Sequence, residues 1–321
     1  VVDRTGLILD IFSLHAQSKE ASLQVELAMS VYLKPRLAGL GKTLNQQGGG
    51  IGTRGPGETK LETDSRLIDN RINKLKKELK KIEKQRNVQS SSREKNNIPL
   101  VSIVGYTNAG KSTLLKKLTN SDAYAADELF ATVDSLQREL RIKDIQDPLI
   151  LSDTVGFIQN LPTTLIESFK STLMVATKAD LLIHVVDAAT ALPEMHINTV
   201  VNILKQIDAK SNEIMVFNKI DKIDKASLNQ LKESYPQALF VSSLKNDGLD
   251  LLKDRIAEEI FGIVSVGSYQ INPSKLDTVA KFGKILNVKN ESNNLVLELE
   301  MRDKLVDRLL NLKIMEKNIN D

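Results

Sequence analysis

One short segment, GYTNAGKS, contains the residue types that bind a polyphosphate, at the spacing that this binding requires. It fits the pattern G-x-x-x-x-G-K-[ST], follows an apolar stretch and opens a helical pattern. Glycines let backbone N–H groups close around phosphate oxygens, the lysine adds a cation, and the serine hydroxyl can ligate Mg²⁺. We therefore predict a phosphate-binding loop, formed by Gly105, Tyr106, Thr107, Asn108, Ala109, Gly110, Lys111, Ser112 and Thr113.

Two later segments contain groups suited to a metal ion and a terminal phosphate. Asp153 begins DTVG at the end of an apolar strand and can hold Mg²⁺ through water, and the N–H of Gly156 can reach the γ-phosphate. In the segment FATVDS, which begins at Phe130, Thr132 can bond both the Mg²⁺ ion and the γ-phosphate. We predict a metal site of Ser112, Thr132 and Asp153, with catalytic roles for Lys111, Thr132 and Gly156.

A second pair of segments predicts which base is bound. The carboxylate of Asp221, in NKID, can accept hydrogen bonds from guanine N1–H and its amino group, whereas adenine would leave this acid unpaired. Lys219 can lie over the base plane, and Asn218 can tie the base-binding and phosphate-binding loops together. The loop VSSLK can present backbone N–H to the guanine carbonyl through Ser242, Ser243 and Leu244. Use of ATP is disfavoured by Asp221.

Phe157 occupies the position after the DxxG glycine, where many GTPases have a glutamine that orients the attacking water. A benzyl side chain cannot hydrogen-bond water. We therefore expect slow hydrolysis until a partner completes the site, and a Phe157→Gln variant that needs the partner less. Phe157 can also simply pack beneath the loop.

Overall composition narrows the remaining possibilities. The chain has 321 residues, no cysteine and three histidines. It therefore cannot form a disulfide, and a zinc site is improbable. The absence of cysteine suits a protein of the reducing cytoplasm. No apolar run is long enough to span a bilayer. The opening VVDRTGLILDIF lacks an initiator Met and is typical of a strand-forming domain, which predicts that the N-terminus is missing.

Short apolar strands alternate with helical segments from residue 99 to residue 262 and predict a mostly parallel sheet with helices on both faces. The helices are expected to begin near Lys111, Thr164, Pro193, Ser227 and Leu249. The expected strands are Leu100–Val104, Leu149–Leu151, Asp180–Val186, Glu213–Phe217 and Leu239–Val241, with Leu136–Ile142 as an added strand. Residues 263–321 predict a small α+β domain without a chemical motif.

Residues 1–98 predict an α/β region that ends in an antiparallel helical hairpin. Apolar residues at helical spacing run from Ser18 to Leu40, with Pro35 expected to kink or divide the helix, and again from Ile68 to Ile82. The residues between Arg54 and Lys95 include thirteen Lys and Arg against seven Asp and Glu. This charge favours an anionic partner, although a solvated helix face would look the same. Asn87–Asn97 is predicted to be a polar linker.

These motifs, together with GGGIGTRGPGETKLETDSRLI, IEKQR and DTVGFI, make the chain similar to HflX, a bacterial GTPase family related to Obg, over residues 1 to about 260. The GTRGPGET segment is the most specific, because common GTPases lack it; without the resemblance it would suit a flexible linker. DTVGF is usual in this family. The chain departs from it at Ser65, where an arginine is usual, and at Leu244, where lysine is common.

The resemblance implies a GTP- and Mg²⁺-dependent, monomeric factor that binds the large ribosomal subunit and splits stalled or idle ribosomes under stress. Its hairpin would approach ribosomal RNA through its Gly-rich end and its lysines. The residues concerned are Gly50, Gly52, Arg54, Gly55, Gly57, Lys60, Lys74, Lys77 and Lys81. Two alternatives stay open: a ribosome-assembly GTPase with the same hairpin, and an RNA-binding adaptor for which the nucleotide is only a structural ligand.

Overall fold

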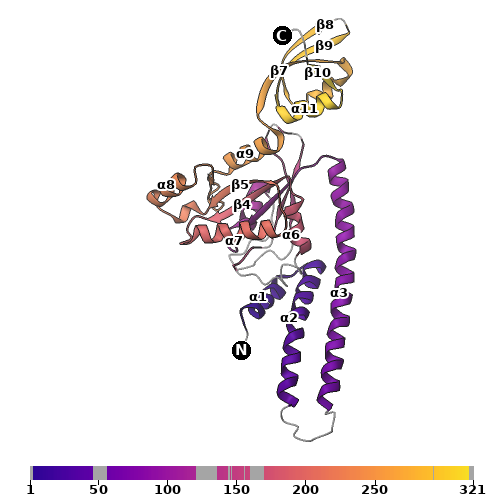
Figure 1. The fold of residues 1–321 in the computed structure, drawn as a ribbon. Coiled ribbons are helices and arrows are strands. Elements are labelled where there is room, and N and C mark those ends of the chain that lie inside the picture. Colours follow the sequence, from indigo (N-terminus) through magenta and orange to yellow (C-terminus); the bar gives the residue numbers. More distant parts are fainter. Residues whose placement is uncertain are drawn as a thin grey trace.

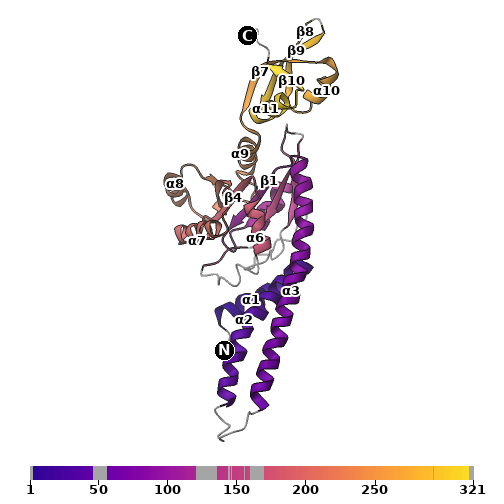
Figure 2. The ribbon, with the colours of Figure 1, turned by 45° about the vertical axis from the view of Figure 1, so that its right-hand side comes forward.

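The computed structural model describes residues 3–45, 56–120, 136–143, 145, 147–154, 156–159, 170–291 and 293–317. Within them the chain forms a helical N-terminal part, a central α/β domain and a small C-terminal domain (Figure 1). The hairpin and the C-terminal domain lie at opposite ends of the central domain in both views (Figure 2). No described helix combines the length and apolar character needed to cross a membrane.

The central sheet confirms the predicted mostly parallel arrangement. Its strand order is β2-β3-β1-β4-β5-β6, and only the edge strand β2 runs antiparallel to its neighbour. The strands are β1 Leu100–Gly105, β2 Gln137–Leu140, β3 Leu149–Asp153, β4 Leu181–Asp187, β5 Asn212–Asn218 and β6 Leu239–Phe240. Strands β1 and β4 are buried almost throughout, as expected of strands covered by helices on both faces.

The helices of this domain are α4 Lys111–Thr119, α6 Lys170–Thr177, α7 Pro193–Gln206, α8 Lys225–Ser234 and α9 Leu249–Phe261, with a 3₁₀ turn η1 Ile220–Lys222. The predicted helix start near Thr164 lies outside the described residues, which resume with α6 at Lys170. Because parallel strands end at one edge of the sheet, β1, β3, β4 and β5 deliver their following loops to the same place.

The N-terminal part contains three helices, α1 Arg4–His15, α2 Lys19–Asn45 and α3 Pro56–Lys95. Helices α2 and α3 form the predicted antiparallel hairpin (Figure 1). Leu27 packs against Ile72 and Leu75 at its centre, and Lys34 pairs with Asp69 across it at 2.5 Å. The predicted seams therefore bury each other.

Two local predictions about this part were wrong, and a third, that Pro35 kinks or divides its helix, was wrong about the division. The opening residues form α1 rather than strands. The Asp3 side chain caps this helix by accepting a hydrogen bond from the Gly6 N–H. In addition, Ile8, Leu9 and Phe12 lie together on its buried face. Helix α2 contains Pro35 and continues beyond it. The predicted linker is mostly helix, because α3 extends to Lys95 alongside the central domain, where the Lys178 ammonium donates to the Asn87 side chain at 2.5 Å.

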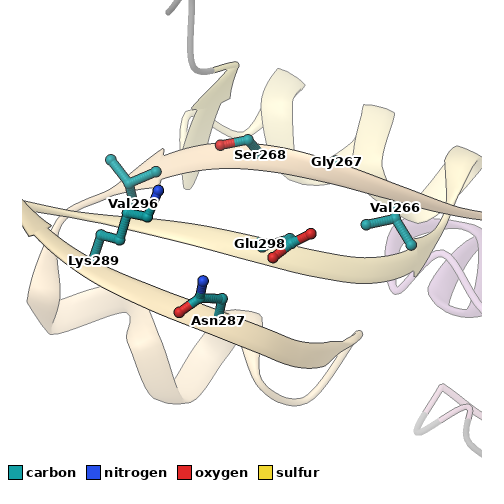
Figure 3. Close-up of a pocket in the computed structure, with 7 residues that line it drawn as sticks. All are labelled: Val266, Gly267, Ser268, Asn287, Lys289, Val296 and Glu298. Atoms are coloured by element: carbon teal, nitrogen blue, oxygen red, sulfur yellow. The ribbon is translucent and has the colours of Figure 1, made fainter. Parts of the chain in front are cut away.

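The C-terminal part is the expected α+β unit. Its sheet has the order β10-β7-β9-β8 and comprises β7 Val264–Ile271, β8 Lys284–Glu291, β9 Asn294–Arg302 and β10 Met315–Lys317. The helical pieces are η2 Pro273–Lys275, α10 Leu276–Val279 and α11 Asp303–Asn311. A hollow of about 350 Å³ on the sheet is lined by residues that include Ser268, Asn287, Lys289 and Glu298 (Figure 3). Its lining residues all belong to the C-terminal sheet and not to the central domain.

Candidate nucleotide-binding site

The phosphate loop has the shape that its sequence predicts. It connects β1 to α4, with positive φ angles of 58° at Asn108 and 89° at Gly110. A Cβ added to Gly110 would lie 2.4 Å from Asn218 Nδ2, so this position requires glycine for space as well as for conformation. Helix α4 begins at Lys111, which turns its first N–H groups toward the loop.

Lys111 lies in the centre of this loop and is almost fully buried. Its ammonium donates to the backbone carbonyl of Tyr106 at 3.0 Å. Burial lowers the pKa of Lys111 from 10.5 to about 8; the negative charge of Asp153 opposes this shift and the positive charge of Lys219 adds to it. A phosphate placed here would restore a firmly charged ammonium.

Ser112 and Asp153 converge from α4 and β3. The Ser112 hydroxyl donates to Asp153 Oδ2 at 2.7 Å, and the carboxylate is completely buried. A hydroxyl and a carboxylate oxygen are ligands that Mg²⁺ prefers, and a buried carboxylate is stabilised by a nearby cation. These two residues therefore fit a metal ion. Thr132 and Phe130, the other predicted members of this region, lie outside the described residues.

Gly156 lies against the phosphate loop. A Cβ added to it would be 2.9 Å from Thr107 Cγ2 and 3.1 Å from Lys111 Nζ, so any side chain here would displace the loop or the lysine. The next residue, Phe157, donates its N–H to the Gly105 carbonyl at 3.1 Å and accepts from Thr107 N–H at 2.9 Å. The strand-like pairing fixes the end of DTVG to the phosphate loop.

The side chain of Phe157 points into the core. It is 2% exposed and belongs to the hydrophobic cluster that contains Val104, Leu173 and Leu182. It therefore cannot lie beside a water that attacks the γ-phosphate, and a glutamine side chain at this backbone position would also start out directed into the core. This is the packing role that the sequence left open for Phe157.

Asn218 ties the two loops together. Its amide Nδ2 donates to the Ala109 carbonyl at 3.0 Å, and its Oδ1 accepts from the Ser243 N–H at 3.0 Å and the Ser243 hydroxyl at 2.9 Å. Asn218 is 1% exposed, so losing it would leave these buried groups without their acceptor and donor.

The acid predicted to recognise guanine is oriented by a neighbour. The Ser242 hydroxyl donates to Asp221 Oδ1 at 2.5 Å, and its oxygen accepts from Lys245 N–H at 3.1 Å. The side chain of Leu244 is 69% exposed, which leaves only its backbone for a role in the site. Sequence reasoning assigned Ser242 to the base loop but missed this bond, because it joins residues of two different loops.

Two further side chains near the loop were not singled out from the sequence. Asp187, at the end of β4, pairs with Lys219 at 2.9 Å. His196 of α7 stacks on the Tyr106 ring, with centroids 3.9 Å apart and planes 9° apart. Asp187 could have been noticed, because it ends a strand between the two strands that lead to the phosphate and base motifs.

The predicted RNA-binding residues lie away from this site. Lys74, Lys77 and Lys81 are exposed on α3, and Gly57 and Lys60 lie in its first turns. Gly50, Gly52, Arg54 and Gly55 lie outside the described residues.

A mostly parallel sheet with a phosphate loop after β1, a hydroxyl–carboxylate pair formed by Ser112 of α4 and Asp153 of β3, and the NKID loop after β5 is the arrangement of a P-loop GTPase. Comparison with known proteins agrees. Residues 100–219 match the family described as "50S ribosome-binding GTPase", and residues 15–93 match "GTP-binding GTPase Middle Region". The chain is 44% identical to GTPase HflX of Caldanaerobacter subterraneus and 40% identical to that of Escherichia coli, covering 98% and 96% of this chain and 73% of each relative.

This chain therefore belongs to the HflX family of GTPases. Among solved structures it is similar to SsGBP in complex with GDP, with 32% identity, a TM-score of 0.50, and coverage of 80% of this chain and 72% of that one. The resemblance to HflX, the α/β P-loop fold and the assignment as a GTPase are thus confirmed.

Proposed function

We propose that this GTPase, in its GTP-bound form, docks its basic hairpin on the large ribosomal subunit and drives ribosomal subunits apart. Hydrolysis promoted by the ribosome would then release it. The observation that carries this proposal is the direct attachment of the helical region to the segment that follows DTVG. The matched family description, which names 50S ribosome binding, agrees with it.

The attachment begins one residue after Phe157. Ile158 packs against the apolar cluster of α1 and α2, which contains Leu9, Phe12 and Val25. The next residue, Gln159, accepts from the Arg4 guanidinium at 2.6 Å through its carbonyl and donates its N–H to the Tyr106 hydroxyl at 3.2 Å. A shift of Gly156 on binding or losing the γ-phosphate would therefore be transmitted to α1 through these contacts.

Helix α1 is in turn joined to the hairpin. The Tyr32 hydroxyl of α2 donates to Asp3 at 2.7 Å, and Arg36 forms an ion pair with the same carboxylate. These contacts give a continuous path of packed and hydrogen-bonded groups from the phosphate loop to α2, the kind of element that can transmit a change of state.

The hairpin supplies the charge for an RNA partner. Lys74, Lys77 and Lys81 are exposed, and no acidic side chain of the described residues forms an ion pair with them. Exposed lysines bind phosphates and release counterions, so this contact would weaken as salt increases.

Within the nucleotide site we assign Ser112 and Asp153, with Thr132, to Mg²⁺. The ion would neutralise charge on the phosphate oxygens. Lys111 would bind the β- and γ-phosphates, Gly156 would donate its N–H to the γ-phosphate, and Asp221 would select guanine. Because Phe157 is directed into the core, we infer that water is poorly oriented without a partner and that turnover is slow until the ribosome supplies or reshapes a group.

One experiment tests the proposal. GTP turnover and the content of intact ribosomes are measured together, with whole ribosomes, large subunits or no particle, and with GTP or a non-hydrolysable analogue. Ribosome splitting by the analogue-bound protein is the expected result. Stimulated turnover without splitting would favour an assembly factor, and turnover that no particle stimulates would favour an RNA-binding adaptor.

A further inference from the structure

Asp187 occupies the end of β4, between the strands that lead to the phosphate loop and to NKID. Its two carboxylate oxygens have separate partners. Oδ2 accepts from the Lys219 ammonium at 2.9 Å, and Oδ1 accepts from the backbone N–H of Ala189 at 2.9 Å. The second bond fixes the carboxylate relative to its own backbone. The side chains of Lys219 and Asp187 are only 14% and 22% exposed, so the pair is shielded from water.

Lys219 is held at its far end by three acceptors. Besides Asp187, its ammonium contacts the Asn108 carbonyl at 2.5 Å and Asn108 Oδ1 at 3.3 Å. An ammonium has three donors, so these contacts can use all of them. Its backbone is also constrained, with φ of 66°. The aliphatic stem is thus stretched between the base loop and the phosphate loop.

We propose that Asp187 is a positioning residue for guanine binding: it anchors the Lys219 ammonium so that the stem presents a fixed apolar surface to the base, without touching the nucleotide itself. This inference rests on the nucleotide site proposed above. The two Asn108 acceptors are uncharged, so among these three acceptors of the Lys219 ammonium the negative charge comes from Asp187. Without it, a shielded ammonium loses its charged partner and the stem is free to leave the base plane.

The test separates base binding from phosphate binding. Equilibrium constants are measured for GDP and for inorganic pyrophosphate, with the wild-type chain, Asp187→Asn and Asp208→Asn. Asp208 is the matched control, because it forms an ion pair with Lys210 at 3.1 Å whose side chains are 78% and 80% exposed. Asp187→Asn is expected to weaken GDP about tenfold, as for loss of a charged hydrogen bond. Pyrophosphate binding should not change, and Asp208→Asn should change neither.

If Asp187 only stabilised the structure of the site, Asp187→Asn would weaken the binding of GDP and of pyrophosphate together. Unchanged GDP affinity in Asp187→Asn would also overturn the inference. In the Lys219→Met background, Asp187→Asn should have no further effect on GDP, and an additive loss would contradict the proposed route through Lys219. If Asp187→Asn does not fold, Asp187→Glu is measured, with a loss of about threefold expected for GDP alone, since the charge is kept but displaced. A wild-type chain that binds no GDP would instead refute the nucleotide site.

Discussion

The guanidinium of Arg4 donates to the backbone carbonyl of Gln159 at 2.6 Å, across 155 residues of sequence. Arg4 is the first residue of α1, and Gln159 lies three residues after Gly156 of DTVG. This bond, together with Ile158 in the apolar cluster of α1 and α2, joins the phosphate site to the helical region. It makes the proposed communication between nucleotide and hairpin open to direct test.

Replacing Arg4 by Met should weaken that communication without affecting the nucleotide. We expect GDP affinity to change less than twofold, because the Gln159 carbonyl to which Arg4 donates is not among the groups assigned to the nucleotide. The difference in large-subunit affinity between the GTP-analogue and GDP forms should fall by about fivefold to tenfold, as for loss of one charged hydrogen bond. Lys19→Met, at an exposed lysine at the start of α2, is the control. An undiminished difference between the two nucleotide forms would exclude Arg4 from the path.

Phe157, which stands where many GTPases have a glutamine, should also contribute to the stability of the fold. Because its side chain is 2% exposed in the core, Phe157→Ala should lower the free energy of unfolding by about 3–5 kcal/mol in chemical denaturation. Phe157→Leu should lose about 1 kcal/mol.

The same geometry changes the expectation for Phe157→Gln. This variant should be destabilised like the alanine variant and should not gain ribosome-independent turnover, because the new amide would start out in the core. Rapid turnover by isolated, folded Phe157→Gln would show that the side chain can swing into the site.

Nucleotide affinity should decrease at alkaline pH. Since the pKa of Lys111 is about 8 in the free protein and a bound phosphate favours the cation, binding above that pH requires proton uptake. The GDP dissociation constant should be nearly constant below pH 7 and rise by up to about tenfold per unit above pH 8.

Titration calorimetry from pH 6.5 to 9 checks this dependence. GMP, which lacks the β-phosphate, is the control and should show a much smaller change. Parallel profiles for GDP and GMP would contradict the assignment to Lys111.

Ser242→Ala should weaken GDP binding through Asp221. Losing the hydroxyl that orients this carboxylate should cost about 1.5 kcal/mol, or roughly tenfold in the GDP dissociation constant. The preference for GDP over ADP should shrink in the same variant. Leu244→Ala, in the same loop but with an exposed side chain, should behave like the wild type. Equal losses in both variants would indicate general damage to the loop.

The hairpin lysines should set the salt dependence of ribosome binding. Changing Lys74, Lys77 and Lys81 together to Gln should reduce the slope of log affinity against log salt by about two to three. The control changes three exposed lysines of the C-terminal part, Lys275, Lys281 and Lys289, in the same way. If the slope of log affinity against log salt decreases equally in both triple variants, ribosome binding depends on overall charge and not on the hairpin.

The nucleotide motifs, the sheet and the helical hairpin could all be predicted from the amino-acid sequence. Each is encoded locally: GYTNAGKS needs its glycines and lysine within a few residues, and the seam from Ile68 to Ile82 follows the helix repeat. Local patterns failed at α1, whose apolar run was interpreted as strand, and at Asn87–Asn97, where packing beside the central domain extends α3 despite poor helix formers.

Contacts between groups that are distant in the sequence became known from the fold. The inward direction of Phe157, the Arg4–Gln159 bond and the Asp187–Lys219 pair join residues from separate elements. The packing of the sheet, the helices and the loops determines which of these residues come into contact, and this packing depends on the whole chain. A local pattern can specify a residue's type and its element, but the contact across elements exists only after folding has brought them together.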